Sequence, residues 1–121
     1  METTHIEQIM LFALENVKEG ITITNPRLKY NPLIYVNKGF CLITGYEKEE
    51  VVGKNCRFLQ GSETEQEAVK KISAAIANEE SVQQEILNFK KDGTRFWNRV
   101  SITPILMNQM CYHILLVFRK T

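Results

Sequence analysis

The amino-acid sequence predicts an α+β fold, in which one antiparallel sheet carries short helices on one face. An N-terminal helical pattern is followed by two β-like segments, several helical segments up to about residue 78, and three β-like segments from residue 82 onward. Strands that are grouped in this way, rather than alternating with helices, favour an antiparallel sheet over a parallel one.

The length and composition are those of a single globular domain. The chain has 121 residues, of which 44% are hydrophobic and 24% charged, so it can bury a core without disulfides or metals. The net charge of +1 gives no electrostatic reason to expect nucleic acid or an anionic membrane as a partner. No apolar run reaches the length of a membrane span, and no signal peptide opens the chain.

The three cysteines, Cys41, Cys56 and Cys111, are an odd number and lack the spacing of metal ligands. We therefore expect free thiols, no metal site and a cytoplasmic location. The sequence also lacks a glycine-rich phosphate loop, a His-Glu-x-x-His motif and a Cys-x-x-Cys motif.

The first predicted helix begins at a capping box formed by Thr4 and Glu7 and ends by Gly20. Leu11 and Phe12 widen its apolar stripe beyond what packing on one surface requires. Either the helix lies on its own domain, or it forms a homodimer through an exposed apolar face. We expect residues 1–19 to form this cap or dimerisation helix and residues 20–121 to form the core domain. The stripe consists of Ile6, Ile9, Met10, Ala13, Leu14 and Val17.

The first half of the core combines short strands with short helices. Residues 21–24 and 33–37 alternate or are β-branched as strands are, and both are bounded by Asn-Pro turns. Residues 40–46 form a short helix that Gly45 closes, and residues 47–52 form one further turn. The longest core helix starts at a capping box within residues 62–67 and ends near Asn78.

The second half is predicted to be strands. Residues 82–90 and 94–103 form a hairpin around the Lys91-Asp92-Gly93 turn, and Pro104 ends its second arm. Residues 111–118 form a last, almost continuously apolar strand.

The segment Gly53-Lys54-Asn55-Cys56-Arg57-Phe58-Leu59-Gln60-Gly61 carries the strongest chemical signal. If it is helical, Cys56, Leu59 and Gln60 share one face, because residues three and four apart are neighbours. Arg57 points elsewhere and suits an anionic group such as a phosphate. A lone helical cysteine is more often a small buried apolar residue than a reactive one, so the residues alone leave its role open.

Two amides form a second candidate site. Asn88 and Asn98 lie on opposite arms of the predicted hairpin, ten residues apart, and would lie nearly across from each other. Alternation places Asn98 on one face with Val100 and Ile102. Buried amides need partners, so the two either bond each other and the backbone or bind a ligand.

The Gly53–Gly61 segment resembles the Gly-x-Asn-Cys-Arg-Phe-Leu-Gln motif of LOV (light-oxygen-voltage) domains, the flavin-binding blue-light sensors of the PAS superfamily. The resemblance extends from Gly20 to Phe118 and implies a five-stranded sheet. It also implies non-covalently bound FMN in the dark, with riboflavin or FAD as alternatives, and a reversible adduct between Cys56 and flavin C4a on illumination. No substrate is turned over in that chemistry, so we do not expect an enzyme. The alternative is a PAS interaction module or flavin redox sensor with an attenuated light response.

The resemblance also implies roles for the candidate residues. The positions of Asn88 and Asn98 bind the pyrimidine edge of flavin in LOV domains. The positions of Asn55 and Gln60 contact the ribityl chain, and that of Arg57 pairs with the phosphate. The remaining two positions, which sandwich the ring, are those of Leu59 and Ile102.

The sequence departs from the LOV pattern at three positions. Ser73 stands where plant LOV domains carry a second phosphate-binding arginine, which puts the selectivity for FMN over riboflavin in doubt. Val117 aligns with a glutamine that faces the flavin, and valine has no hydrogen-bonding side chain. Leu115 aligns with a glycine on the same face. The sequence indicates no output partner.

Overall fold

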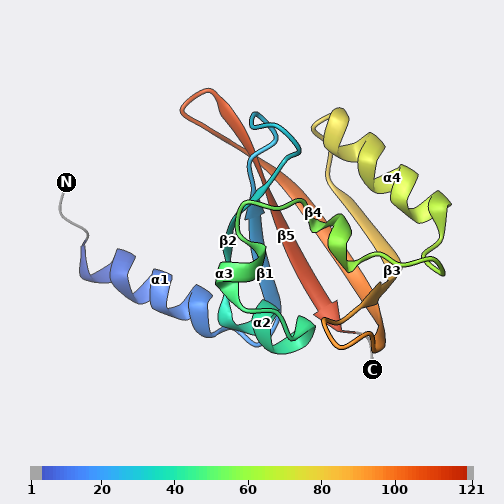
Figure 1. Ribbon diagram of the computed structural model, residues 1–121. Helices are drawn as coiled ribbons and strands as arrows, with labels where there is room; N and C mark the ends of the chain where they lie inside the picture. Colours follow the sequence, from blue (N-terminus) through green and yellow to red (C-terminus); the bar gives the residue numbers. More distant parts are fainter. Residues whose placement is uncertain (1–3, 120–121) are drawn as a thin grey trace.

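The computed structural model describes residues 4–119 (Figure 1). Residues 1–3 of the expected N-terminal segment, and residues 120 and 121 of the expected core segment, lie outside this range. The elements in chain order are α1 (His5–Asn16), β1 (Gly20–Thr24), β2 (Leu33–Val36), α2 (Lys38–Thr44), α3 (Lys48–Val51), the 3-10 helix η1 (Cys56–Leu59), α4 (Gln66–Ala77), β3 (Val82–Phe89), β4 (Arg95–Met107) and β5 (Met110–Arg119).

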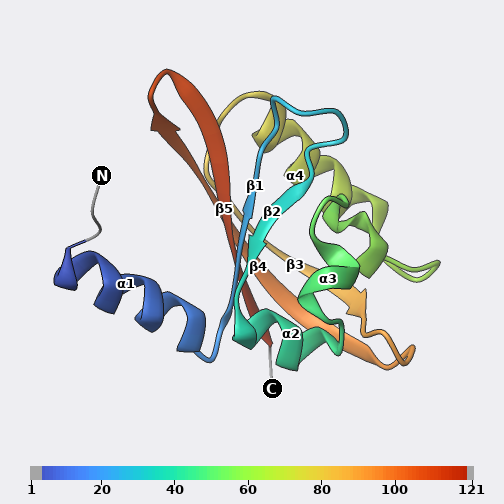
Figure 2. The same ribbon diagram turned by 60° about the vertical axis from the view of Figure 1, so that its left-hand side comes forward.

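The five strands form one antiparallel sheet in the order β2-β1-β5-β4-β3, which confirms the predicted α+β class. Helices α2, α3 and α4 lie on one side of this sheet, whereas α1 lies on the other side (Figure 2). Two groups of buried side chains fill the space under the helices. One group is Leu33, Val36, Phe40, Val51, Leu59, Phe96 and Val117, and the other is Ala68, Ile86, Val100, Ile102 and Leu115.

Asn37 joins three elements at one buried point. The predicted strand of residues 33–37 is one residue too long, because Asn37 is the N-cap of α2. Its Oδ1 accepts from the backbone N–H groups of Ile21 (2.8 Å) and Phe40 (2.9 Å). Its Nδ2 donates to the carbonyl of Leu14 at 2.8 Å and that of Glu19 at 3.1 Å. Asn37 therefore ties the end of α1 and the start of β1 to the start of α2.

Helix α1 carries the predicted capping box of Thr4 and Glu7, but it ends at Asn16 rather than near Gly20. None of its side chains is buried, and Ile9 and Phe12 are 66% and 71% exposed. Among the described residues, only the last turn of α1 contacts the domain, through Glu15 with Tyr35 and the Leu14 carbonyl with Asn37, so most of the apolar stripe is not covered by the domain. No helix of the described residues is long and apolar enough to cross a membrane.

The start of α4 differs from the prediction. Its N-cap is Glu65, and no side chain caps it, so the predicted capping boxes are wrong. Instead, the Thr64 hydroxyl accepts from the N–H of Gly61 (3.0 Å) and donates to the carbonyl of Leu87 (2.7 Å). A tertiary partner on β3 therefore takes the hydroxyl that the local pattern assigned to the helix end.

The prediction that Pro104 ends its strand is also wrong, because β4 continues to Met107. Beyond the pair of Val82 with Ile102, β4 has only β5 as a neighbour, and Pro104 lies in this part opposite His113. Such an edge position tolerates a residue without an N–H group.

Replacing Asn37 with alanine should destabilise the fold by about 2–4 kcal/mol, because it leaves several buried backbone groups without partners. The free energy of unfolding in urea measures this loss. Asn16→Ala is the matched control, since the Asn16 amide is exposed and bonds only within α1. Equal, small losses in both variants would contradict the role assigned to Asn37.

Candidate functional site

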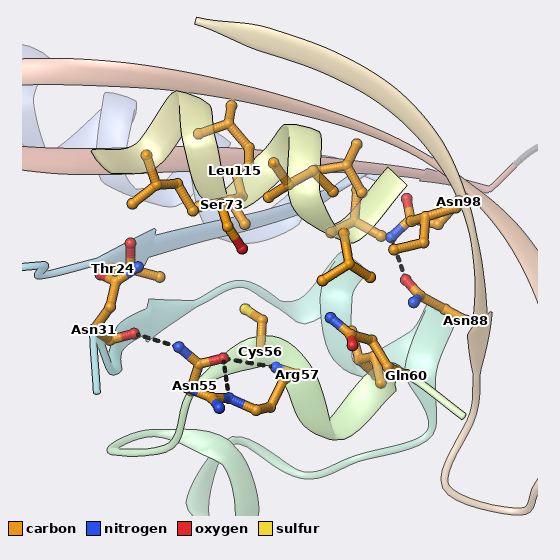
Figure 3. Close-up of a pocket in the computed structure, with 18 of the residues that line it drawn as sticks. Thr24, Asn31, Asn55, Cys56, Arg57, Gln60, Ser73, Asn88, Asn98 and Leu115 are labelled. Atoms are coloured by element: carbon orange, nitrogen blue, oxygen red, sulfur yellow. Dashed lines mark hydrogen bonds between the residues drawn. The ribbon is translucent and has the colours of Figure 1, made fainter. Parts of the chain in front are cut away.

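A cavity of about 290 Å³ lies between the sheet, η1 and α4 (Figure 3). This volume is at the lower end of the range for small-molecule sites, about 300–1,000 Å³. All the residues predicted for the site line this one cavity: Asn55, Cys56, Arg57, Leu59, Gln60, Asn88, Asn98, Ile102 and Val117.

The cysteine-bearing segment is a 3-10 helix rather than an α-helix. Residues three apart are eclipsed in such a helix, so Cys56 and Leu59 share a face as predicted. Gln60 is not part of that helical face, because it is the C-cap and its backbone is extended. It nevertheless lines the cavity, so the segment presents all three side chains to one space.

Asn55 fixes the position of η1. Its Oδ1 accepts from the backbone N–H of Arg57 at 2.9 Å and from the Arg57 Nε–H at 3.3 Å. Its Nδ2 donates to the carbonyl of Tyr30 at 2.7 Å, in the loop between β1 and β2. The amide therefore orients the Arg57 guanidinium at the exposed rim of the cavity and holds the cysteine turn against that loop.

The sulfur of Cys56 points into the cavity (Figure 3). Burial raises the pKa of the Cys56 thiol to about 12. At neutral pH the group is therefore a protonated thiol, and ground-state thiolate chemistry is disfavoured.

Asn88 and Asn98 are diagonal neighbours on one face of the sheet and do not lie directly across from each other. The strand register pairs Asn88 with Phe96 and Asn98 with Ile86. The Asn98 Nδ2 donates to the Asn88 Oδ1 at 2.8 Å, and the Asn88 Nδ2 donates to the adjacent carbonyl of Leu87 at 3.3 Å.

One acceptor of this amide pair is left over. Asn98 is buried, and its Oδ1 has no hydrogen-bond partner among the described residues. The two amides thus bond each other, as one interpretation held, and still present an unpaired acceptor to a ligand.

Strand β5 contributes Leu115 and Val117 to the cavity wall. Both are buried, and the register places Val117 opposite Gly20. A Cβ on Gly20 would lie 3.0 Å from the Val117 Cβ, so the glycine leaves room for the valine. The wall at this position is therefore apolar.

Sequence reasoning missed several lining residues. They include Val69, Ile72 and Ile76 of α4, whose apolar side chains at helical spacing are typical of any helix that faces a core. Thr24 and Asn31 had been read as a strand end and a turn, and no local pattern marks them as pocket residues. The other lining residues are Phe40, Ser73, Ile86 and Val100.

Comparison with known proteins gives a consistent result. The PAS domain family model matches residues 18–118. A blue-light-activated histidine kinase of Brucella anthropi is 50% identical over 93 residues, which are 77% of this chain and 19% of that protein. A blue-light photoreceptor of Listeria monocytogenes is 51% identical over 98 residues, 80% of this chain and 38% of that protein. The chain thus spans well under half the length of these relatives.

Solved structures resemble most of the chain. The LOV domain of an Erythrobacter litoralis blue-light activated histidine kinase is 37% identical, with a TM-score of 0.82 over 86% of this chain and 97% of that one. An RNA-binding light-oxygen-voltage receptor is 31% identical, with a TM-score of 0.90 over 98% of this chain and 34% of that one.

The raised pKa of Cys56 predicts slow alkylation in the dark. Burial raises the pKa of Cys111 as well, but less than that of Cys56. At pH 8, iodoacetamide should therefore modify Cys56 at least about tenfold more slowly than Cys111, whose thiol is half-exposed at the β4–β5 hairpin, because thiolate is the reactive form. The rate at Cys56 should still rise above pH 10. Peptide mass spectrometry with time gives both rates, and Cys56→Ser confirms the assignment of the slow site. Faster modification of Cys56 than of Cys111 would overturn the assigned pKa.

Proposed function

The chain belongs to the LOV group of the PAS domain family, and we propose that it senses blue light through a flavin bound in the cavity beside Cys56. The observation that carries this proposal is the convergence of the cysteine, the amide pair and the arginine on one cavity. The names of the relatives, a blue-light-activated histidine kinase and a blue-light photoreceptor, support the same function.

The residues present fit a flavin. The pyrimidine edge of a flavin presents an N–H donor between two carbonyl acceptors. The unpaired Oδ1 of Asn98 can accept from that donor. The Nδ2 of Asn88, which has only a 3.3 Å bond to a neighbouring carbonyl, can turn to donate to one of the acceptors. Leu59 and Ile102 supply apolar walls for the flat ring.

When bound, the flavin supplies blue-light absorption and a ring carbon that accepts sulfur. Cys56 lines the cavity and is the residue whose sulfur would be placed to bond reversibly to that ring. With a pKa of about 12, the Cys56 thiol stays protonated beside the ring until light is absorbed. This property keeps the dark state free of thiolate side reactions.

FMN is the flavin we propose, because the Arg57 guanidinium at the rim suits a phosphate. Ser73 also lines the cavity and offers only a hydroxyl. The domain acts as a sensor, and no substrate is turned over. We further propose that α1 forms a homodimer contact, since its apolar side chains are exposed.

One observation favours an alternative function. Val117 and Leu115 make the β5 wall apolar, and neither side chain can hydrogen-bond to a flavin. An interaction module or flavin redox sensor with an attenuated light response would have such a wall.

Absorption spectra before and after blue light test the proposed function. The purified protein should be yellow, should bleach reversibly, and should recover in the dark. Cys56→Ala should keep the flavin and lose the bleaching, because the sulfur that bonds to the ring is gone. Cys41→Ala is the matched control and should bleach normally. A yellow protein that does not bleach would favour the redox sensor, and a colourless one the interaction module.

Arg57→Ala should weaken FMN much more than riboflavin. A charge-assisted bond contributes about 1.5–3 kcal/mol, so FMN affinity should fall about 10- to 150-fold. Titration of the flavin-free protein with each ligand, followed by fluorescence, gives the two dissociation constants. The same loss for both ligands would show that Arg57 does not bind the phosphate.

Introducing negative charges into the exposed apolar face of α1 should shift the monomer–dimer equilibrium toward monomer. The double change Ile9→Glu with Phe12→Glu removes two exposed apolar contacts and adds repelling charges. Analytical ultracentrifugation measures the association constant, with Gln8→Glu plus Asn16→Asp as a control that adds the same two charges at exposed polar positions of the helix. A parent protein that is monomeric at high concentration would contradict the dimer.

A further inference from the structure

The end of the cavity away from the Asn88–Asn98 pair contains further unpartnered polar atoms. Figure 3 shows Thr24 and Asn31 at one end of the cavity and the two amides at the other. Among the described residues, the Thr24 Oγ1 and the Asn31 Oδ1 are buried atoms without a hydrogen-bond partner. Thr24 itself is only 2% exposed.

His113 lies directly beside Thr24. The β1–β5 register pairs the two residues, and directly opposed residues share a face of the sheet. Leu115 and Val117 alternate with the same period along β5 and line the cavity, so His113 is on the same face of the sheet. His113 is not itself a lining residue, and it meets the cavity through its neighbour Thr24. His113 is fully buried, and neither ring nitrogen has a partner among the described residues.

The histidine is neutral and offers both kinds of hydrogen bond. Burial lowers its pKa, an effect that Glu79 opposes only in part. A neutral imidazole has one N–H donor and one acceptor nitrogen, and the Thr24 hydroxyl can also play either role. Buried polar groups need hydrogen-bond partners. We therefore expect a polar group of a ligand, or an ordered water, to bond to them at this end of the cavity.

We propose that Thr24 and Asn31, with His113 beside Thr24, form a second polar subsite, which prefers flavins that carry a hydroxyl or amino group on the benzenoid ring. The inference rests on the proposed function. A flavin whose pyrimidine edge is held by Asn88 and Asn98 directs its opposite, dimethylbenzenoid edge toward this end. Methyl groups there would leave the Thr24 and Asn31 side chains unpaired, whereas a hydroxyl or amino group at ring position 8 would pair with them, and the Thr24 hydroxyl could then bond to His113.

Binding in the dark tests the subsite. Riboflavin, 8-demethyl-8-hydroxyriboflavin and 8-demethyl-8-aminoriboflavin carry the same ribityl chain, so contacts of that chain cancel when their dissociation constants are compared. At least one of the polar analogues should bind about five- to tenfold more tightly than riboflavin. Isothermal titration calorimetry on the flavin-free protein gives the three constants.

Substitutions show which side chains cause the preference for the polar analogues over riboflavin. His113→Phe and Thr24→Val keep approximate size and remove the polar atoms, so each should bring the ratio of constants toward one. Ser62→Ala, which changes an exposed hydroxyl outside the cavity lining, should leave the ratio unchanged. If His113→Phe does not fold, Thr24→Val still decides the question.

Three outcomes would overturn the subsite. Riboflavin binding with a ratio near one in the parent protein would mean that water fills this end of the cavity. A preference that survives in both variants would place its origin elsewhere. Failure of all three flavins to bind would overturn the proposed function together with the subsite.

Discussion

The buried side-chain amide of Asn37 is the contact on which the arrangement of the other elements depends. Its oxygen accepts from the N–H groups of Ile21 in β1 and Phe40 in α2. Its nitrogen donates to the carbonyls of Leu14 in α1 and Glu19 just before β1. The N-cap also sets the position of Phe40, which is fully buried and lines the cavity. A side chain on Gly39 would clash with the Glu19 carbonyl, so the backbone approach here is close. One amide thus connects the N-terminal helix to the wall of the site.

The site that this frame supports is apolar in the middle and polar at its ends. Apolar side chains from η1, α4 and β4 form the middle, where a flat ring can be held between them. The polar atoms without partners lie at the ends, on Asn98 at one and on Thr24 and Asn31 at the other. Because unpaired buried acceptors are costly, they indicate where a ligand hydrogen-bonds. Cys56 lies between the ends, and burial keeps its thiol protonated at neutral pH.

The β5 wall limits how a change at the ligand can reach the rest of the protein. Val117 packs against Gly20, the first residue of β1, and it has no group that could exchange a hydrogen bond. A displacement of this wall would act by packing, and interiors at native density transmit small displacements. The residues nearest to this wall are Gly20 and Phe40. Phe40 donates its N–H to Asn37, and Asn37 in turn donates to Leu14 of α1. The exposed apolar face of α1 is the surface that we propose for the homodimer contact.

The sequence by itself determined the α+β class, most of the helices and strands, and the residues around Cys56, because these follow from local patterns and a contiguous motif. Only the tertiary structure decided the rest. Thr64 bonds to β3 instead of capping α4, and Pro104 lies within β4 because β3 has already ended. The contact between Asn88 and Asn98, the pairing of Thr24 with His113 and the raised pKa of Cys56 depend on strand register and burial. These are properties of residues far apart in the chain, and a local pattern does not contain the free energy of removing a group from water.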